Sequence, residues 1–303
     1  MTAKPTLVAR AFAKVNLGLE VLGKRDDGYH ELRTILQTVD LHDELSFCRE
    51  KEGISLTTND PKIGTGPENL VVRAASLLAE SATSSGLGAS IHLEKNVPPG
   101  MGLGGGSADA AVTLLALDAL WDLRTPTQNL HQLAASIGMD VPFFLYGGAA
   151  LAVGRGDEVY PLAVEVDLPI VLILPDFSIS TASAYASLTL TKRRSDLTLQ
   201  HFVWASPCVR DKLAELVNHL ERATGSHTSK IQEYKQVLLD RGALATMMSG
   251  SGSAVFGVFH DEQSARSAAS SLTREGLEAV ATTTLTRQAY RRKRLSGGPG
   301  GDE

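Results

Sequence analysis

Apolar and polar residues alternate near the start of the chain in the pattern of a β-strand. The apolar residues Val15, Leu17, Leu19 and Val21 alternate there with Lys14, Asn16, Gly18 and Glu20. Successive side chains of a strand point to opposite faces, so the pattern predicts one buried face. Lys14 and Asn16 are therefore expected to share the other face.

The rest of the first half predicts further strands and helices. Strands are expected near 35–47, 54–58, 89–94 and 149–153, and a helix near 67–80. Residues 107–120 are apolar on nearly all sides, which is typical of a buried helix, and Ser107 is expected to cap it. A further helix carries Leu130, Leu133, Ala134 and Ile137 on one stripe and ends at Gly138, so that Asp140 lies just beyond it.

The second half mixes helices and strands without regular alternation. Helices are expected near 181–189, 208–222, 230–241 and 262–275, and strands near 169–174, 244–248, 253–259 and 277–285. This order favours an α+β fold over a parallel, doubly wound sheet. The polar, glycine-punctuated stretch from Gly154 to Glu158 predicts a junction between two domains, 1–158 and 159–288. Residues 289–303 are expected to be a disordered tail with a solvated basic run.

Composition narrows the class of protein. The 303 residues are 43% hydrophobic with a formal net charge of −5, and the calculated pI is about 5.9. An acidic chain argues against nucleic-acid binding, which usually needs a basic surface. The two cysteines, Cys48 and Cys208, lack metal-ligand spacing and predict no disulfide framework. Neither a signal peptide nor a run of 18 apolar residues is evident, so we expect a cytoplasmic protein without membrane insertion that acts on small molecules.

Residues 98–108 form a glycine-dense turn that leads directly into the helix expected at 107–120. Their order is Pro98, Pro99, Gly100, Met101, Gly102, Leu103, Gly104, Gly105, Gly106, Ser107 and Ala108. Glycines let backbone N–H groups approach a ligand closely, and the helix start adds a positive dipole, so the segment is a candidate phosphate site. It departs from the dinucleotide and P-loop patterns, because prolines precede it and Gly106 stands where a P-loop has lysine. A plain flexible turn remains the alternative.

Three segments together resemble the superfamily of galactokinase, homoserine kinase, mevalonate kinase and phosphomevalonate kinase. They are Ala13-Lys14-Val15-Asn16-Leu17, the glycine-dense turn, and Met248-Ser249-Gly250-Ser251-Gly252-Ser253, in this order along the chain. The resemblance implies a ribosomal-protein-S5-like N-terminal domain, a ferredoxin-like C-terminal domain and an active site in the cleft between them. It also implies ATP as co-substrate, accompanied by Mg²⁺, for which the sequence shows no protein metal site.

Two further segments resemble one branch of that superfamily, whose acceptor alcohol carries a cytidine diphosphate on the non-mevalonate route to isoprenoid precursors. They are Arg25-Asp26-Asp27-Gly28-Tyr29-His30 and Gly138-Met139-Asp140-Val141-Pro142. The resemblance makes Lys14 and Asp140 the catalytic residues, with Asp140 accepting the proton of the acceptor hydroxyl. It assigns substrate binding to Asn16, Tyr29, His30, Thr181 and Tyr185, and closure of the site to the turn Ser249, Gly250, Ser251 and Gly252.

The chain departs from the branch at two positions. Leu36 stands where some relatives have an aromatic residue, and Tyr185 where they have phenylalanine. Taken singly, each candidate also has an ordinary interpretation: Asp140 as a helix cap, Lys14 as a solvated lysine, Tyr29 and His30 as packing residues, and 249–253 as a plain hairpin turn. A sister kinase acting on homoserine or mevalonate, or a catalytically silent relative, therefore stays an alternative. We expect a monomer or weak dimer.

Overall fold

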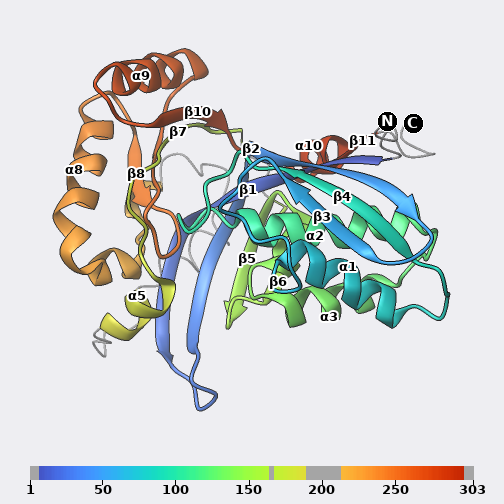
Figure 1. Cartoon of the computed structure of the whole chain (residues 1–303). Helices are drawn as coiled ribbons and strands as arrows, with labels where there is room; N and C mark the ends of the chain where they lie inside the picture. The colour runs from blue at the N-terminus through green and yellow to red at the C-terminus, as the bar shows by residue number, and fades with distance from the viewer. Residues whose placement is uncertain (1–6, 164–166, 189–212, 297–303) are drawn as a thin grey trace.

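A computed structural model describes residues 7–163, 167–188 and 213–296. The first half of the chain builds one sheet with helices on one side of it (Figure 1). Its elements are β1 (Leu7–Lys24), β2 (His30–Glu50), β3 (Ile54–Thr58), α1 (Leu70–Ser81), β4 (Gly88–Glu94), α2 (Gly105–Leu120), α3 (Thr127–Ile137), α4 (Val141–Tyr146), β5 (Ala149–Gly154) and β6 (Glu158–Pro161).

The long hairpin β1–β2 organises the first sheet. Its strand order is β11-β1-β2-β4-β3, where β11 (Leu295–Ser296) comes from the end of the chain, and β5 pairs with β2 and with β6. Only the β3–β4 pair of this sheet is parallel. Apolar residues of one sheet face, such as Phe47 and Leu93, pack with Val71 of α1 and Leu114 of α2. The helix α2 is buried on nearly every side, as its continuous apolar sequence predicts.

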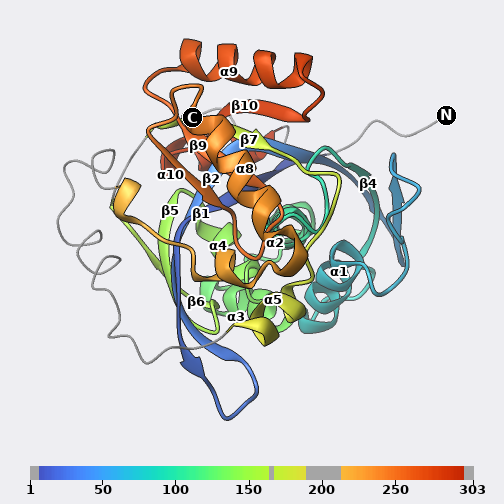
Figure 2. The same cartoon turned by 90° about the vertical axis from the view of Figure 1, so that its left-hand side faces the viewer.

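The second half of the chain forms a smaller sheet covered by two helices. Its elements are β7 (Pro169–Ile173), α5 (Thr181–Ser187), α8 (Thr228–Leu239), β8 (Ala245–Met248), β9 (Val255–Val258), α9 (Glu262–Arg274) and β10 (Ala279–Thr283). The strand order is β10-β7-β9-β8, antiparallel throughout. Helices α8 and α9 lie on its outer side, nearest the viewer in Figure 2, and bury Leu238 and Leu272 against Val171 and Val255.

The two sheets share a hydrophobic core, and β1 contributes to it. Val15 and Leu17 pack against Ile170 and Leu172 of β7 and Phe256 of β9. The alternation predicted for this strand is confirmed, because these residues face the second sheet. Lys14 and Asn16 lie on the other face, which is not open to solvent: both residues are buried.

Most of the expected elements are present, and the α+β class is confirmed. Several predictions are nevertheless wrong. The helix expected near 208–222 is replaced, in its described part, by single 3₁₀ turns at Leu213–Glu215 and His219–Ala223; residues 208–212, with Cys208, lie outside the described residues. Helix α4 and strand β6 were not expected. Since β6 pairs with β5, the first sheet continues past the expected junction to Pro161.

The expected disordered tail is wrong for residues 289–296. They belong to α10 (Arg287–Arg294) and β11 (Leu295–Ser296), and β11 pairs with β1. Tyr290 is buried against Phe12, and its hydroxyl donates to the Phe144 carbonyl. Arg294 of the basic run donates to the Leu145 carbonyl at 3.0 Å rather than being solvated. Residues 297–303 lie outside the description. Over the residues described, no helix is long and apolar enough to cross a membrane.

Candidate active site

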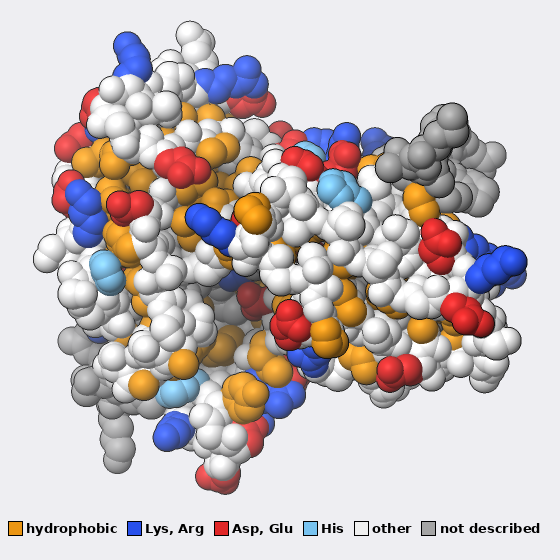
Figure 3. All heavy atoms as spheres, viewed as in Figure 1, with side chains coloured by type: hydrophobic (Ala, Val, Ile, Leu, Met, Phe, Trp, Pro, Cys, Tyr) orange, Lys and Arg blue, Asp and Glu red, His pale blue; other side chains and the backbone are white. Residues whose placement is uncertain are grey.

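A cavity of about 1140 Å³ opens between the two halves of the molecule. Figure 3 shows the surface hollowed at this place. The first half contributes the β1–β2 hairpin, the glycine-dense turn and the segments at 139–140 and 155–156; the second half contributes residues 178–182, Tyr185, Ala186, Gly250 and Ser251. Predicted catalytic, nucleotide-binding and substrate-binding residues thus line one cavity.

Lys14 and Asp140 meet at the wall of this cavity. Lys14 Nζ lies 3.6 Å from Asp140 Oδ2, although β1 carries the first residue and the start of α4 the second. The lysine side chain is 4% exposed, whereas the aspartate is 40% exposed. Asp140 occupies the N-cap position of α4, but its side chain makes no capping hydrogen bond. The carboxylate is therefore available to a ligand on the cavity side, while Lys14 is fixed behind it.

A chain of hydrogen bonds fixes Lys14. Its Nζ donates to Asn16 Oδ1 at 2.6 Å, Asn16 Nδ2 donates to Thr34 Oγ1 at 2.8 Å, and Thr34 Oγ1 donates to the Gly18 carbonyl at 2.7 Å. All these residues lie on the facing strands β1 and β2, where Asn16 and Thr34 line the cavity. The hydrogen bond from the Lys14 ammonium group to the Asn16 amide oxygen is charge-assisted and therefore strong.

The glycine-dense turn lies over Lys14. The Lys14 N–H donates to the Leu103 carbonyl at 2.9 Å. Gly104 has a φ of +70°, and a Cβ there would lie 3.1 Å from Lys14 Cγ and 2.9 Å from Phe144 Cζ. Only glycine combines this backbone with so close an approach. Gly100, Gly102 and Ser107 line the cavity, whereas Leu103, Gly105 and Ala108 are buried away from it.

The expected cap at Ser107 is wrong, because α2 begins two residues earlier. Gly104 is the N-cap and offers no side chain to the first N–H groups of the helix. Ser107 lies within the first turn and lines the cavity instead. The start of α2 therefore presents uncapped backbone donors and the positive end of its dipole beside Lys14, an arrangement suited to phosphate oxygens.

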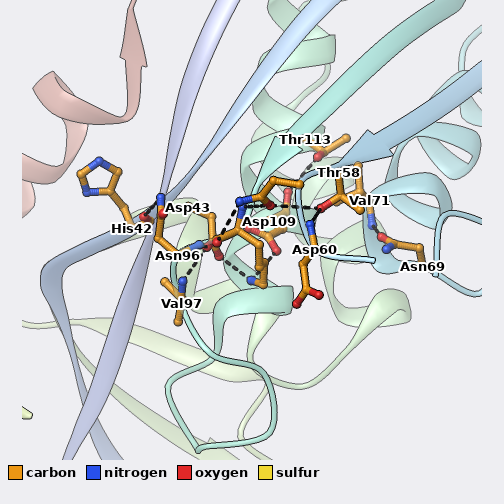
Figure 4. Close-up of polar contacts among 12 residues, drawn as sticks. His42, Asp43, Thr58, Asp60, Asn69, Val71, Asn96, Val97, Asp109 and Thr113 are labelled. Carbon is orange, nitrogen blue, oxygen red and sulfur yellow. Dashed lines mark hydrogen bonds and ion pairs between the residues drawn. The ribbon is translucent and has the colours of Figure 1, made fainter. Parts of the chain in front are cut away.

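A buried ionic cluster joins the residues just before the glycine-dense turn to helix α2. Lys95 Nζ donates to Asp43 Oδ2 at 2.5 Å and to Asp109 Oδ2 at 3.0 Å. Asp43 Oδ1 also accepts the N–H groups of Asn96 and Val97 at 2.6 and 2.7 Å, as Figure 4 shows. Burial raises the pKa of Asp109 well above its usual value. Burial opposes the charge of Lys95, but Asp109 and Asp43 outweigh it and raise the pKa of the lysine.

The second glycine turn, between β8 and β9, closes against the first. Ser249 Oγ donates to the Gly102 carbonyl at 2.9 Å, and the Ala254 N–H donates to the Met101 carbonyl at 3.1 Å. A Cβ on Gly102 would lie 2.0 Å from the Ser249 carbonyl oxygen. The segment is thus a hairpin turn and also part of the cavity wall, where Ser251 Oγ lies 2.8 Å from Thr181 Oγ1.

Aromatic residues also line the cavity. The rings of His30 and Tyr185 are stacked with centroids 5.0 Å apart. Burial, and to a lesser degree Asp140, raises the pKa of the Tyr185 phenol, while burial and Lys24 lower the pKa of His30. Both rings therefore favour their neutral forms at neutral pH. Tyr29 is 48% exposed, and the Arg155 guanidinium lies 5.3 Å from its ring centroid.

Thr34 and Arg155 are among the cavity residues that no sequence motif indicates. Thr34 lies on β2, belongs to no motif and pairs with Leu19 of β1, so its side-chain contact with Asn16 becomes visible only in the structure. Arg155 lies in the stretch interpreted as a domain junction, where its glycine neighbours suggested a linker. Among the described residues no group of three or more histidine, cysteine, aspartate or glutamate side chains could hold a metal ion.

Comparison with known proteins covers nearly the whole chain. The family model for the GHMP kinases N terminal domain matches residues 69–148, and the model for the GHMP kinases C terminal matches residues 208–278. The chain is 41% identical over 283 residues to the 4-diphosphocytidyl-2-C-methyl-D-erythritol kinase of Pelotomaculum thermopropionicum, covering 92% of this chain and 98% of that protein. Identity to the protein of the same name from Moorella thermoacetica is 40%, covering 92% of this chain and 99% of the relative.

Solved structures show the same similarity. A crystal structure of 4-(cytidine 5'-diphospho)-2C-methyl-D-erythritol kinase superposes with a TM-score of 0.79 at 38% identity, covering 92% of this chain and 99% of that one. Homoserine kinase from Cytophaga hutchinsonii superposes with a TM-score of 0.72 at 19% identity, covering 94% and 96% of the two chains. The second likeness concerns the fold alone.

Proposed function

The chain belongs to the 4-diphosphocytidyl-2-C-methyl-D-erythritol kinases, a family of GHMP kinases, and we propose that its cavity performs the reaction for which those relatives are named. In this reaction ATP phosphorylates the 2-hydroxyl of 4-diphosphocytidyl-2-C-methyl-D-erythritol, on the non-mevalonate route to isoprenoid precursors. The products are the 2-phosphate and ADP. The contact between Lys14 and Asp140 inside a cavity lined by both glycine turns carries the proposal.

The glycine-dense turn holds the triphosphate of ATP. Backbone N–H groups at the start of α2 donate to phosphate oxygens, and the helix dipole favours their negative charge. Lys14 supplies the cation that the turn itself lacks. Because Lys14 is buried and held by Asn16 at 2.6 Å, its charge is in place before the reaction and needs little reorganisation.

Asp140 orients the acceptor hydroxyl and takes its proton. The hydroxyl oxygen forms a bond to the γ-phosphorus while the bond from that phosphorus to the β,γ-bridging oxygen breaks, and ADP leaves. In a loose transition state the hydroxyl becomes acidic only as its oxygen bonds to phosphorus, so a well-placed weak base is sufficient. Positioning and electrostatic stabilisation then provide most of the rate enhancement.

The aromatic end of the cavity binds the cytidine. The stacked pair of His30 and Tyr185 and the half-exposed ring of Tyr29 offer flat apolar faces to a base. Stacking of a base on an aromatic side chain contributes roughly 1–3 kcal/mol. Arg155, beside Tyr29, places a cation near the diphosphate that follows the nucleoside. Asn16 and Thr181 add polar contacts to the acceptor.

Magnesium accompanies ATP in this proposal and neutralises part of the phosphate charge. The Ser107 hydroxyl on the cavity wall is suited to face such an ion, with phosphate oxygens and water completing its shell. A cytoplasmic location and a monomeric or weakly dimeric state complete the proposal.

A substrate panel tests the proposed function. The purified protein, with ATP and Mg²⁺, is offered the cytidine-linked methylerythritol, homoserine, mevalonate and galactose, and ADP release is measured by a coupled assay. We expect turnover of the first acceptor alone. Preference for homoserine or mevalonate would identify a sister kinase, and no turnover of any acceptor would identify a ligand-binding relative.

A further inference from the structure

The segment from Val217 to Glu221 connects the strand that carries Lys14 to the second glycine turn. The Leu19 N–H of β1 donates to the Val217 carbonyl at 2.9 Å, and Leu19 forms a parallel β-bridge with Asn218. Two residues farther along β1, the Val21 N–H donates to His219 Nδ1 at 3.1 Å. The backbone of this segment is therefore fixed to β1, close to its cavity-lining part.

Asn218 reaches from this segment to the second glycine turn. It is 5% exposed, and its Nδ2 donates to the Met248 carbonyl at 2.8 Å and to the Gly250 carbonyl at 2.7 Å. Its Oδ1 accepts the Leu220 N–H at 2.9 Å. Both amide hydrogens and the amide oxygen are thus engaged in a buried setting, where losing a partner is costly.

Gly250, whose carbonyl accepts a hydrogen bond from Asn218, lies beside Lys14 and Asn16. A Cβ on Gly250 would lie 3.3 Å from Lys14 Nζ and 3.2 Å from Asn16 Oδ1. The neighbouring Met248 N–H donates to Glu221 Oε1 at 2.9 Å, which ties the same turn to the same segment a second time. A shift of the glycine turn would therefore alter the wall against which Lys14 meets the phosphates.

We propose that Asn218 is a positioning residue for phosphoryl transfer, which holds the second glycine turn at a fixed distance from Lys14. It acts through the Gly250 backbone and touches neither substrate. This inference rests on the proposed kinase function. Its physical basis is that displacing reacting groups by about 1 Å can lower a rate by about 100-fold, whereas binding of the distant cytidine is little affected.

The variant Asn218→Asp tests this role most directly. Aspartate has nearly the same size and keeps the acceptor for the Leu220 N–H, but it cannot donate to the two carbonyls. Per-site turnover is obtained by dividing the rate by the number of nucleotide-binding sites measured by calorimetry. We expect this turnover to fall at least about tenfold, with unchanged stoichiometry and a KM for the cytidine substrate within about threefold of the original.

Two further variants and the unaltered protein make the test decisive. Asn218→Ala removes the donors without adding a charge and replaces Asn218→Asp should the latter not fold. Lys230→Gln removes a 2.8 Å contact with Glu233 on the exposed side of α8, away from the glycine turn, and its per-site turnover should stay near the original. The inference would be overturned by normal per-site turnover on fewer binding sites in both Asn218 variants. An equal loss of turnover in Lys230→Gln would also overturn it. An inactive unaltered protein would instead refute the proposed function.

Discussion

Lys14 is a charged side chain held almost entirely away from water. Its position depends on glycine at 104, since any Cβ there would press against the lysine side chain, and on the Asn16 amide oxygen, which accepts its hydrogen bond. A buried ammonium group needs such partners, because desolvation alone would strongly disfavour its charge. The Asp140 carboxylate, which is far more exposed, completes the pair from the cavity side.

Replacing Asp140 by asparagine should separate binding from chemistry. Asparagine preserves the shape but cannot take the acceptor proton. We expect ATP binding near that of the unaltered protein and turnover reduced at least about 100-fold, measured by coupled ADP release. Asp122→Asn, in the exposed loop after α2, is the matched control and should leave turnover unchanged. Near-normal turnover of Asp140→Asn would remove the residue from the catalytic role.

We propose that Tyr29 binds the cytidine end of the acceptor. Tyr29→Ala should raise the KM for the cytidine substrate by about tenfold and lower kcat much less, because it removes a stacking surface used equally before and during reaction. Tyr160, a comparably exposed tyrosine on β6 that lies outside the cavity lining, serves as the control. Initial rates measured over a range of acceptor concentrations give KM and kcat separately. An unchanged KM in Tyr29→Ala would exclude Tyr29 from the site.

Gly102 tests the contact between the two glycine turns. Its φ is +75°, and an added Cβ would lie 2.0 Å from the Ser249 carbonyl oxygen. Gly276 has a similar φ of +89° but open space around it, so Gly276→Ala should lower the free energy of unfolding by only about 1 kcal/mol. Gly102→Ala should cost more and also weaken ATP binding. Urea unfolding measures the free energy of unfolding, and calorimetric titration measures ATP affinity. Equal stability and equal ATP affinity of the two variants would contradict the contact.

Individual side chains could be assigned from the sequence only where several motifs reinforced each other. Lys14 and Asp140 are ordinary residues by themselves, and their motifs, not their spacing, predicted that they act together. Asn218 has no such motif, and its partners are backbone carbonyls, which any sequence offers. A buried amide that serves the backbone leaves no periodic or compositional signal, so it became visible only in three dimensions.

At the scale of elements, the start of α2 depends on the ionic cluster below it. Asp43 of β2 accepts hydrogen bonds from two backbone N–H groups just before the glycine-dense turn and from the ammonium group of Lys95. The cluster therefore joins the sheet, the turn and Asp109 of α2 into one unit.

Asp43→Asn should loosen that unit. The amide keeps the size of the carboxylate but loses the charge that partners Lys95 and leaves that lysine with Asp109 alone. Removing one member of a buried ionic cluster typically costs about 3–5 kcal/mol, so we expect a loss of that size in urea unfolding. Asp261→Asn at the exposed start of α9 is the control, with a loss of about 1 kcal/mol or less. Equal losses would show that the cluster contributes no special stability.

Elements with strong periodicity were predictable, and short or atypical ones were not. β1 and α9 follow regular apolar spacing over many residues, and α2 is recognisable as a long segment that is apolar on nearly all sides. Helix α4 has only six residues, nearly all apolar, which gives no helical stripe to recognise. Helix α10 reads as a solvated basic run because Tyr290 is its single buried residue, and tertiary contacts rather than composition make it a helix.

For the whole molecule, the site depends on two sheets being held together. β1 belongs to the first sheet by pairing and to the core of the second by its apolar face, so it joins the halves and presents Lys14 between them. The α+β class followed from the order of predicted elements. The completion of the first sheet by β11 pairs segments at opposite ends of the chain, which local patterns do not encode. Strand β6 pairs locally with β5, but it has only four residues and none of them is buried, so it shows no apolar alternation.

Shortening the chain should measure how much α10 and β11 contribute to the free energy of unfolding. Ending it after Thr286 removes the buried Tyr290 and uncovers Phe12. Deleting a large buried aromatic side chain costs about 3–5 kcal/mol, so we expect a loss of at least that size, measured by urea unfolding. Ending the chain after Ser296 keeps both elements and should leave stability unchanged. Equal stability of the two shortened proteins would contradict a structural role for α10.

The pairing of β11 with β1 also affects how the protein is made. β1 leaves the ribosome long before β11. Its outer edge near Val8 and Ala9 therefore stays unpaired with β11 until nearly all later residues have been synthesised. During synthesis that edge can pair with other nascent chains. Chaperone capture, or aggregation when translation stalls before residue 287, should therefore concentrate on the first strand to emerge.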